Sequence, residues 1–272
     1  MLYLVATPIG NLQDISSRAL DILRQVDCIY CEDTRHSQKL LNHFGIKNTL
    51  KSFHKFNERQ TEIQIIRSLK EGKQVALISD AGTPGISDPG EQLVKLCKEE
   101  GISVSPIPGP CALIQALSGS GLNSSRFQFL GFVPRKQGEI KELLNEVLRY
   151  PGTSILYESP RRLQATLHAL CDLNPEADVV VARELTKQFE EFVKGTATTV
   201  LQHFSLSEIK GEIVLLIEGK APENDWKDLT PDEHVAMVEK DYRVTKKEAI
   251  KIVAELRGLP KRQIYNALHT SD

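Results

Sequence analysis

The sequence predicts an α/β protein, and three observations in residues 1–118 lead to that prediction. Short apolar segments alternate with stretches of helical period, which is the pattern of a layered α/β domain. Glycine follows several of the helical stretches, where it favours the end of a helix. Residues 75–79 form a continuous apolar run, typical of a strand that is buried on both faces of a parallel sheet.

The first predicted domain, residues 1–118, is a three-layer domain. Its strands are predicted at residues 2–6, 27–31, 75–79 and 103–107. Its helices are predicted at residues 16–26, 37–44, 58–71, 90–100 and 111–117. Ser16 is placed to cap the first helix. The stretch Ser118-Gly119-Ser120-Gly121 is typical of a linker and is predicted to separate this domain from the next.

The second predicted domain, residues 119–222, contains more strand. Its strands are predicted at residues 127–132, 154–157, 179–182, 189–193 and 213–218, and its helices at residues 140–149 and 161–171. This content indicates a mixed sheet with helices packed on it.

Residues 223–272 are predicted to form a helical appendage. Thr230-Pro231-Asp232-Glu233 has the pattern of a capping box, and helices follow at residues 246–256 and 261–269. The turn between these two helices contains Gly258, which fits a helix-turn-helix. A helical hairpin docked on the body of the protein is the alternative. The tail is locally basic, with seven Lys or Arg against three acids in residues 242–272.

Composition excludes several classes of protein. With 40% hydrophobic and 26% charged residues, the chain has the balance of a globular protein rather than a disordered one. The net charge of −2 exerts no general attraction for nucleic acid, so a polyanion would need a local basic patch. No apolar run reaches the roughly 18 residues that span a bilayer, and the start lacks a signal peptide. We therefore expect a cytoplasmic protein without a membrane partner.

Neither the cysteines nor the histidines predict a metal site. The five cysteines are odd in number, which suits reduced thiols in the cytosol. Cys28 and Cys31 are three residues apart on a predicted strand, so their side chains point to opposite faces. The histidines do not form H-E-x-x-H or another ligand pair. Metal catalysis is therefore not expected.

Three loops rich in glycine and proline follow predicted strands, at residues 7–11, 79–90 and 106–110. In open α/β sheets, ligands bind at the carboxyl ends of the strands. Such loops present main-chain amides and carbonyls, which suits a nucleoside-bearing cofactor. The P-loop and G-x-G-x-x-G patterns of phosphate and dinucleotide binding are missing, as is the G-x-S-x-G of a hydrolase.

Polar clusters also follow the predicted strands. They are residues 32–36, the acids Asp80 and Asp88 on either side of the glycine loop, residues 157–162 and residues 183–187. Each cluster alone could be a solvated turn. Together they indicate that the strand ends carry the chemistry.

Five strings at or near strand ends occur in order along the chain. They are Val5-Ala6-Thr7-Pro8-Ile9-Gly10-Asn11-Leu12, Glu32-Asp33-Thr34-Arg35, Ser79-Asp80-Ala81-Gly82-Thr83-Pro84, Tyr157-Glu158-Ser159-Pro160-Arg161-Arg162 and Ala182-Arg183-Glu184-Leu185-Thr186-Lys187. Together they resemble the ribosomal RNA small subunit methyltransferase I family of the tetrapyrrole methylase superfamily. The likeness spans essentially the whole chain. It includes residues 246–268, which are similar to that family's C-terminal helix-turn-helix segment.

The resemblance implies a class III S-adenosylmethionine methyltransferase with two α/β domains, a cofactor cleft between them and a small C-terminal helix-turn-helix. It also implies a homodimer that methylates the ribose 2′-hydroxyl of a cytidine in the decoding region of small-subunit (16S) ribosomal RNA. The substrate would be the RNA itself or the 30S subunit. The cofactor-binding positions carried over by the resemblance are Pro8, Ile9, Thr83, Pro84, Ile86, Cys111, Ala112, Tyr157, Glu158, Leu185, Glu212 and Ile213.

A ribose hydroxyl is a weak nucleophile, so methyl transfer to it needs a base and good alignment. Our hypothesis is that Asp80 or Glu32 accepts the proton while Arg35 orients the hydroxyl or a phosphate. RNA contacts are expected from local cations, namely Arg35, His36, Arg135, Lys136, Arg161, Arg162 and the basic tail.

Two other functions remain open from the sequence. One is a sister methyltransferase of the same fold that acts on a tetrapyrrole or a protein residue. Gly82-Thr83-Pro84 stands where tetrapyrrole enzymes often have G-D-P, which favours the RNA branch. The other is a ligand-sensing regulator that binds nucleic acid and catalyses nothing.

Overall fold

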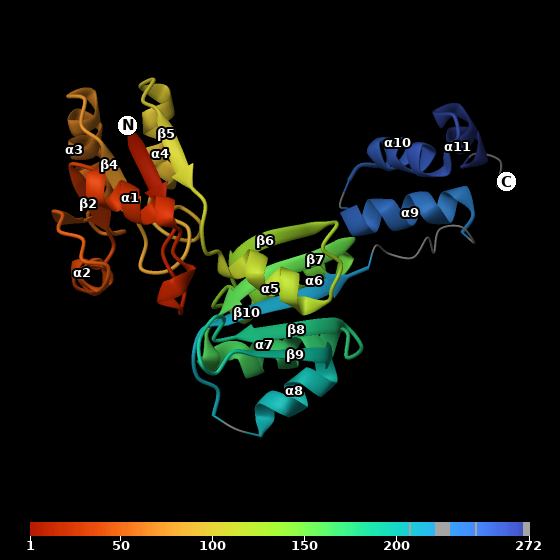
Figure 1. Ribbon diagram of the computed structural model, residues 1–272. Coiled ribbons are helices and arrows are strands. Elements are labelled where there is room, and N and C mark those ends of the chain that lie inside the picture. The colour runs from red at the N-terminus through yellow and green to blue at the C-terminus, as the bar shows by residue number, and fades with distance from the viewer. Residues whose placement is uncertain (207, 221–228, 243, 269–272) are drawn as a thin grey trace. The chain divides into compact units, whose positions relative to one another are not determined.

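The computed structural model describes residues 1–206, 208–220, 229–242 and 244–268. The chain divides into two compact units, Met1–Lys220 and Ala221–Asp272. The first unit contains two five-stranded sheets (Figure 1). The described part of the second unit is helical.

The first sheet is entirely parallel, with the strand order β3-β2-β4-β1-β5. Its strands are β1 (Leu2–Val5), β2 (Cys28–Cys31), β3 (Leu50–Ser52), β4 (Val75–Ile78) and β5 (Val104–Ile107). All five carboxyl ends therefore lie at one edge of the sheet. The sequence predicted four of them and missed β3, a three-residue edge strand with no buried residue and an exposed Lys51 at its centre.

Helices cover both faces of the first sheet, which confirms the predicted three layers. One face packs against α1 (Ser17–Gln25) and α2 (Thr34–His43), and the other against α3 (Glu58–Lys70) and α4 (Glu91–Glu99). Cys31 packs on the α1 side and Cys28 on the α3 side, as expected for thiols three apart on a strand.

The starts of α1 and α2 are set by caps. Ser16 accepts a hydrogen bond from the Ala19 N–H, which confirms its predicted role at the start of α1. α2 begins at Thr34, three residues before the predicted start at residue 37. The reason is that the Asp33 side chain caps the helix by accepting a hydrogen bond from the Arg35 N–H.

The second sheet is mixed, as predicted, with the order β6-β7-β10-β8-β9. Its strands are β6 (Phe127–Phe132), β7 (Gly152–Glu158), β8 (Asp178–Arg183), β9 (Glu191–Thr196) and β10 (Ile213–Gly219). Only β6 and β7 are parallel, and the other pairs are antiparallel. β9 begins two residues later than the strand predicted at residues 189–193.

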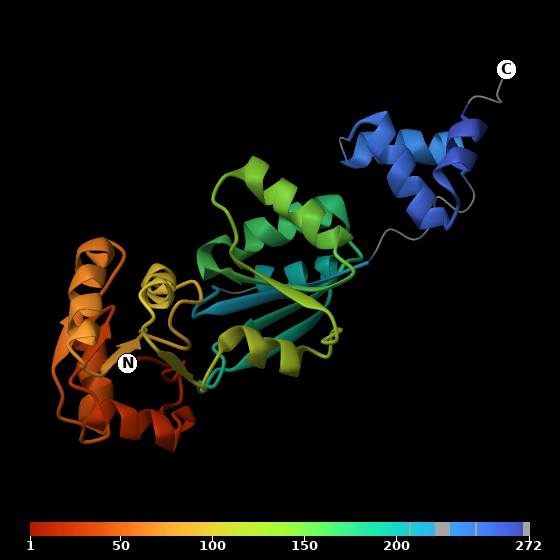
Figure 2. The same cartoon turned by 90° about the horizontal axis from the view of Figure 1, so that it is seen from above.

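One face of this sheet packs against α6 (Gln137–Arg149), α7 (Pro160–Leu173) and α8 (Ala197–Ser205). The sequence pattern did not predict α8. The opposite face packs against α5 (Ala112–Ser120) (Figure 2). The two faces thus have separate hydrophobic cores.

The prediction of a linker at residues 118–121 is wrong, because these residues form the last turn and the cap of α5. Gly121 adopts the left-handed conformation that ends the helix, with φ 65°. A Cβ at Gly119 would come within 2.7 Å of the Phe192 ring, so this glycine permits close packing rather than flexibility. The expected boundary at residue 118 therefore falls inside a helix that follows the first sheet and covers the second.

The second unit has its own core, formed by α9 (Pro231–Tyr242), α10 (Lys246–Arg257) and α11 (Lys261–Ala267). Thr230 and Glu233 form the predicted capping interaction, with the Thr230 N–H donating to the Glu233 carboxylate over 2.8 Å. Gly258 has φ 64° in the turn between α10 and α11. Both predicted helices are present, although residue 269 lies outside the described residues. Within the described part of the chain, no helix combines the length and apolarity needed to span a membrane.

Candidate active site

The three glycine/proline loops meet at the carboxyl edge of the first sheet and are joined by hydrogen bonds. Thr7 and Gly82 exchange main-chain hydrogen bonds of 2.9 and 3.0 Å. The Thr83 hydroxyl donates to the Pro110 carbonyl over 3.2 Å. The loops predicted separately therefore form one continuous surface.

The turn after β4 is fixed by buried hydroxyl groups. Thr7 Oγ1 donates to the Ser79 carbonyl over 3.1 Å, and Ser79 Oγ donates to the Gly82 carbonyl over 3.1 Å. Gly82 has φ 84°, a conformation that other residues rarely adopt. A side chain at this position would strain the turn that supports the site.

A cavity of about 420 Å³ opens beside this surface and is lined by both halves of the first unit. Its volume lies in the range of about 300–1,000 Å³ that holds whole small-molecule ligands. The predicted cofactor residues that line it are Ile9, Thr83, Ile86, Cys111, Ala112, Tyr157, Glu158, Leu185, Glu212 and Ile213. Pro84 does not line it, and Pro8 lines a smaller cavity nearby.

The wall from the second sheet carries an aromatic group centred on Tyr157. Its ring makes edge-to-face contacts with Phe129 at 5.0 Å and Phe132 at 5.4 Å between centroids. Burial raises the pKa of Tyr157 to about 12, with smaller contributions from Cys111 and Asp88. The phenol is therefore neutral at physiological pH. Phe132 also lines the cavity although 60% of it is exposed.

Glu158 borders the cavity, but its carboxylate is occupied by the protein. It accepts hydrogen bonds of 2.7 Å from the Ser159 N–H and the Thr166 hydroxyl. It also forms a 2.6 Å ion pair with Arg162, which in turn donates to the Val133 and Pro134 carbonyls. Arg162 is thus committed to this network rather than available for RNA.

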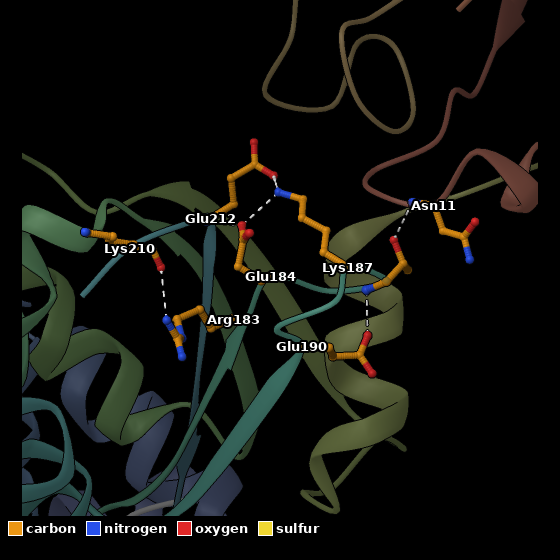
Figure 3. Close-up of polar contacts among 8 residues, drawn as sticks. Asn11, Arg183, Glu184, Lys187, Glu190, Lys210 and Glu212 are labelled. Atoms are coloured by element: carbon orange, nitrogen blue, oxygen red, sulfur yellow. Dashed lines mark hydrogen bonds and ion pairs between the residues drawn. The ribbon is translucent and has the colours of Figure 1, made fainter. Parts of the chain in front are cut away.

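The loop after β8 is held by a lysine between two glutamates, as Figure 3 shows. Lys187 Nζ lies 2.8 Å from both Glu184 and Glu212. The hydrogen bond from Lys187 holds the pKa of Glu184 below its ordinary value. Glu184 has φ 52°, and a Cβ at Gly211 would collide with its carboxyl group. The network fixes both segments beside the cavity, including the predicted cofactor residues Leu185 and Glu212.

The same loop closes against the loop after β1. The Asn11 N–H donates to the Thr186 hydroxyl over 3.0 Å, and Thr186 has φ 64°. Figure 3 shows Asn11 beside the loop that carries Lys187 and Glu190. A Cβ on Gly10 would lie 2.7 Å from that hydroxyl and would overlap Lys187. Gly10 therefore allows the two loops to approach.

Acids form one edge of the cavity. Asp80 and Asp88 line it, and Asp80 accepts a 3.2 Å hydrogen bond from the Asp33 N–H. Burial, followed by the negative charge of Glu32, raises the pKa of Asp88 to about 6. Burial and the charge of Asp80 raise the pKa of Glu32 in turn. The charge of Asp80 thus contributes to the raised pKa of Glu32, and the charge of Glu32 to that of Asp88.

Two of the three residues predicted to be catalytic do not line the cavity. Glu32 acts on it through its charge, as the pKa of Asp88 shows. Arg35 extends into solvent with 89% of its side chain exposed, and it pairs with Asp33 at 3.0 Å. The hydrogen bonds from Arg35 lower the pKa of Asp33 to about 2. Asp80 alone among the three faces the cavity.

Sequence reasoning also missed residues that line this cavity. Asp88 was noted as one of two acids around the glycine loop, but not as a proton acceptor. Its raised pKa depends on burial among other acids, which spacing does not reveal. Phe132 ends β6, and only its exposure beside Tyr157 distinguishes it from a core aromatic.

The fold and this site together define a class of protein. Residues 1–201 match the family described as Tetrapyrrole (Corrin/Porphyrin) Methylases. A crystal structure of diphthine synthase shares the fold, with a TM-score of 0.63 and 17% identity over 80% of this chain and 90% of that one.

Curated relatives are similar over nearly the full length. Ribosomal RNA small subunit methyltransferase I of Halalkalibacterium halodurans is 45% identical, over 98% of this chain and 94% of the relative. The Bacillus subtilis protein of the same name is 42% identical, over 99% and 94%. The chain belongs to the ribosomal RNA small subunit methyltransferase I family, within the tetrapyrrole methylases.

Proposed function

We propose that the protein transfers a methyl group from S-adenosylmethionine to the ribose 2′-hydroxyl of a cytidine in the decoding region of small-subunit ribosomal RNA. The observation that carries the proposal is the acid-edged cavity where the glycine/proline loops meet the second sheet. The names of the curated relatives support ribosomal RNA as the substrate. The resemblance of the five sequence strings supports the cytidine and its 2′-hydroxyl.

The cavity fits this cofactor in size and charge. Its lining contains the acids Asp80, Asp88, Glu158 and Glu212 but, among the described residues, no Lys, Arg or His. Glu158 and Glu212 pair with Arg162 and Lys187, so Asp80 and Asp88 are the acids that give the lining its negative character. Such a lining favours a cofactor with a positive sulfonium and disfavours a polyphosphate. When bound, S-adenosylmethionine supplies an activated methyl group. Ile9, Leu185 and the neutral Tyr157 offer apolar contacts, and the glycine loop offers main-chain groups.

The chain's contribution to the reaction is alignment and proton removal. Alignment of reacting groups supplies about 7–11 kcal/mol in the best cases. A bound S-adenosylmethionine would supply the methyl carbon, and its sulfur would keep the electrons of the broken carbon–sulfur bond. The hydroxyl proton passes to the Asp80/Asp88 pair. The pKa of about 6 at Asp88 makes it a stronger base than an ordinary aspartate, yet largely ionised at neutral pH.

RNA binding is assigned to cations outside the donor cavity. Arg35, Arg135 and Arg161 are exposed, and the second unit adds the basic helices α10 and α11. A helix-turn-helix role for these helices, a homodimer and a cytoplasmic location belong to the same proposal. The family resemblance supports the first two, and the reduced cysteines support the third.

Kinetics of Asp80→Asn and Asp88→Asn test the assignment of the base. Loss of a general base lowers kcat by about 10²–10⁴. We expect at least one variant to show this loss while cofactor affinity, measured by calorimetry, falls far less. Asp172→Asn, an exposed carboxylate on α7, is the control. Full methylation by both active-site variants would refute the assignment.

A further inference from the structure

A second, smaller cavity lies next to the donor cavity. Its volume is about 150 Å³, and residues that line it include Thr7, Pro8, Leu12, His36 and Lys39. Asp80 lines both cavities. Asp80 can therefore contact a group bound in either cavity.

The two cavities differ in charge. The donor cavity has no Lys, Arg or His among its described lining residues, whereas the second has His36 and Lys39, both on α2. His36 and Lys39 are three residues apart on this helix, so they share a face. Both are exposed, and neither forms an ion pair with another described residue. The second cavity therefore presents the Lys39 ammonium and an imidazole N–H of His36 as donors to an anion.

The second cavity is small, and apart from His36, Lys39, Thr7 and Asp80 its lining is apolar. Pro8 and Leu12 contribute carbon surface, and Leu12 stands on the short 3-10 helix η1 (Leu12–Asp14) with 38% of it exposed. A volume of about 150 Å³ is below the range of about 300–1,000 Å³ for whole ligands. It suits part of a nucleotide while the remainder of the strand stays outside.

We infer that this second cavity binds the ribose–phosphate of the acceptor nucleotide. Lys39 and His36 contact the phosphate, and Pro8 and Leu12 contact the sugar. The 2′-hydroxyl then lies beside Asp80, facing the donor cavity. This inference rests on the proposed function and adds where on the chain the acceptor strand is held.

Lys39→Ala and His36→Ala test the phosphate contact. The measurements are KM for the unmodified small subunit, kcat, cofactor affinity, and the dependence of RNA affinity on salt. We expect KM to rise at least about tenfold for Lys39→Ala, as for other lost hydrogen bonds between charged groups. The logarithmic salt slope should fall by about 0.7, the value for one phosphate of a single strand. Cofactor affinity should not change.

Lys95→Ala is the matched control for charge. Lys95 is an exposed lysine on α4, which packs on the opposite face of the first sheet from α2. Its removal changes the net charge equally, so KM and the salt slope should stay as in the wild type. Equal effects of Lys39→Ala and Lys95→Ala would reduce the inference to general electrostatics and overturn it.

Leu12→Trp tests the shape of the cavity independently of charge. The larger side chain should fill the space from an exposed turn without disturbing the core. We expect a raised KM for RNA with unchanged cofactor affinity and thermal stability. If the wild type methylates RNA but neither Leu12→Trp nor Lys39→Ala affects KM, the acceptor lies elsewhere. If the wild type methylates no RNA, the proposed function itself fails.

Discussion

Asp88 illustrates how burial among like charges changes the chemistry of one carboxyl group. The sequence placed it beside a glycine loop at a strand end. The structure adds the neighbours, Glu32 and Asp80, that make ionisation costly. Arg35 was predicted to act at the reacting oxygen because it follows β2, but the structure does not place it there. Its own helix cap, Asp33, holds it in solvent instead. Such local partners are not evident from spacing alone.

Asp88→Asn should stabilise the protein above pH 6. The folded state raises the pKa of Asp88 from 3.8 to about 6, so it binds the proton more tightly than the unfolded chain. The ionised carboxyl therefore destabilises the fold above pH 6 but not below about pH 4. A shift of about two units, reduced for solvent screening, corresponds to about 1–2 kcal/mol. Urea unfolding at pH 8 should show this gain and at pH 4 should not. Equal stability of the two proteins at pH 8 would contradict the burial argument.

At the scale of elements, strong hydrophobic patterns predicted most strands and helices, but short or disguised elements escaped. β3 has no buried residue, so nothing in its pattern marks it as a strand. The stretch at residues 118–121 has the composition of a linker. Instead, Gly119 allows close contact with Phe192, and Gly121 caps α5. The three glycine/proline loops were predicted correctly as neighbours because parallel strands place their carboxyl ends together.

Gly10→Ala tests whether the contact between the loops after β1 and β8 shapes the donor cavity. A Cβ would overlap Lys187 and crowd the Thr186 hydroxyl, so the loops must separate. We expect cofactor affinity to fall about tenfold or more, equivalent to about 1.4 kcal/mol. Gly138→Ala on α6 meets nothing within 4 Å and should leave affinity unchanged. Its helix should gain at most about 1 kcal/mol. Calorimetric titration of both variants with the cofactor measures these affinities. Equal cofactor affinities of the two variants would show that the close approach of the two loops is not required.

At the scale of the whole molecule, function arises where the two sheets contribute to one cavity. The first sheet supplies the acids and the glycine loops, and the second supplies Tyr157, Leu185 and the Lys187 network. Ten of the residues that line this cavity are positions carried over by the family resemblance, which spans both sheets. The resemblance did not predict the second cavity. The sequence alone does not show that His36 and Lys39 line the same cavity as Asp80.

The proposed reaction is methyl transfer to a ribose in small-subunit RNA. The most direct test incubates the protein with S-adenosylmethionine labelled on its methyl group and small subunits that lack the modification, and then maps the labelled nucleotide. We predict label on the 2′-oxygen of a cytidine in the decoding region, with release of S-adenosylhomocysteine. Label on a base or on a ribosomal protein, or no incorporation by protein that binds the cofactor, would contradict the account.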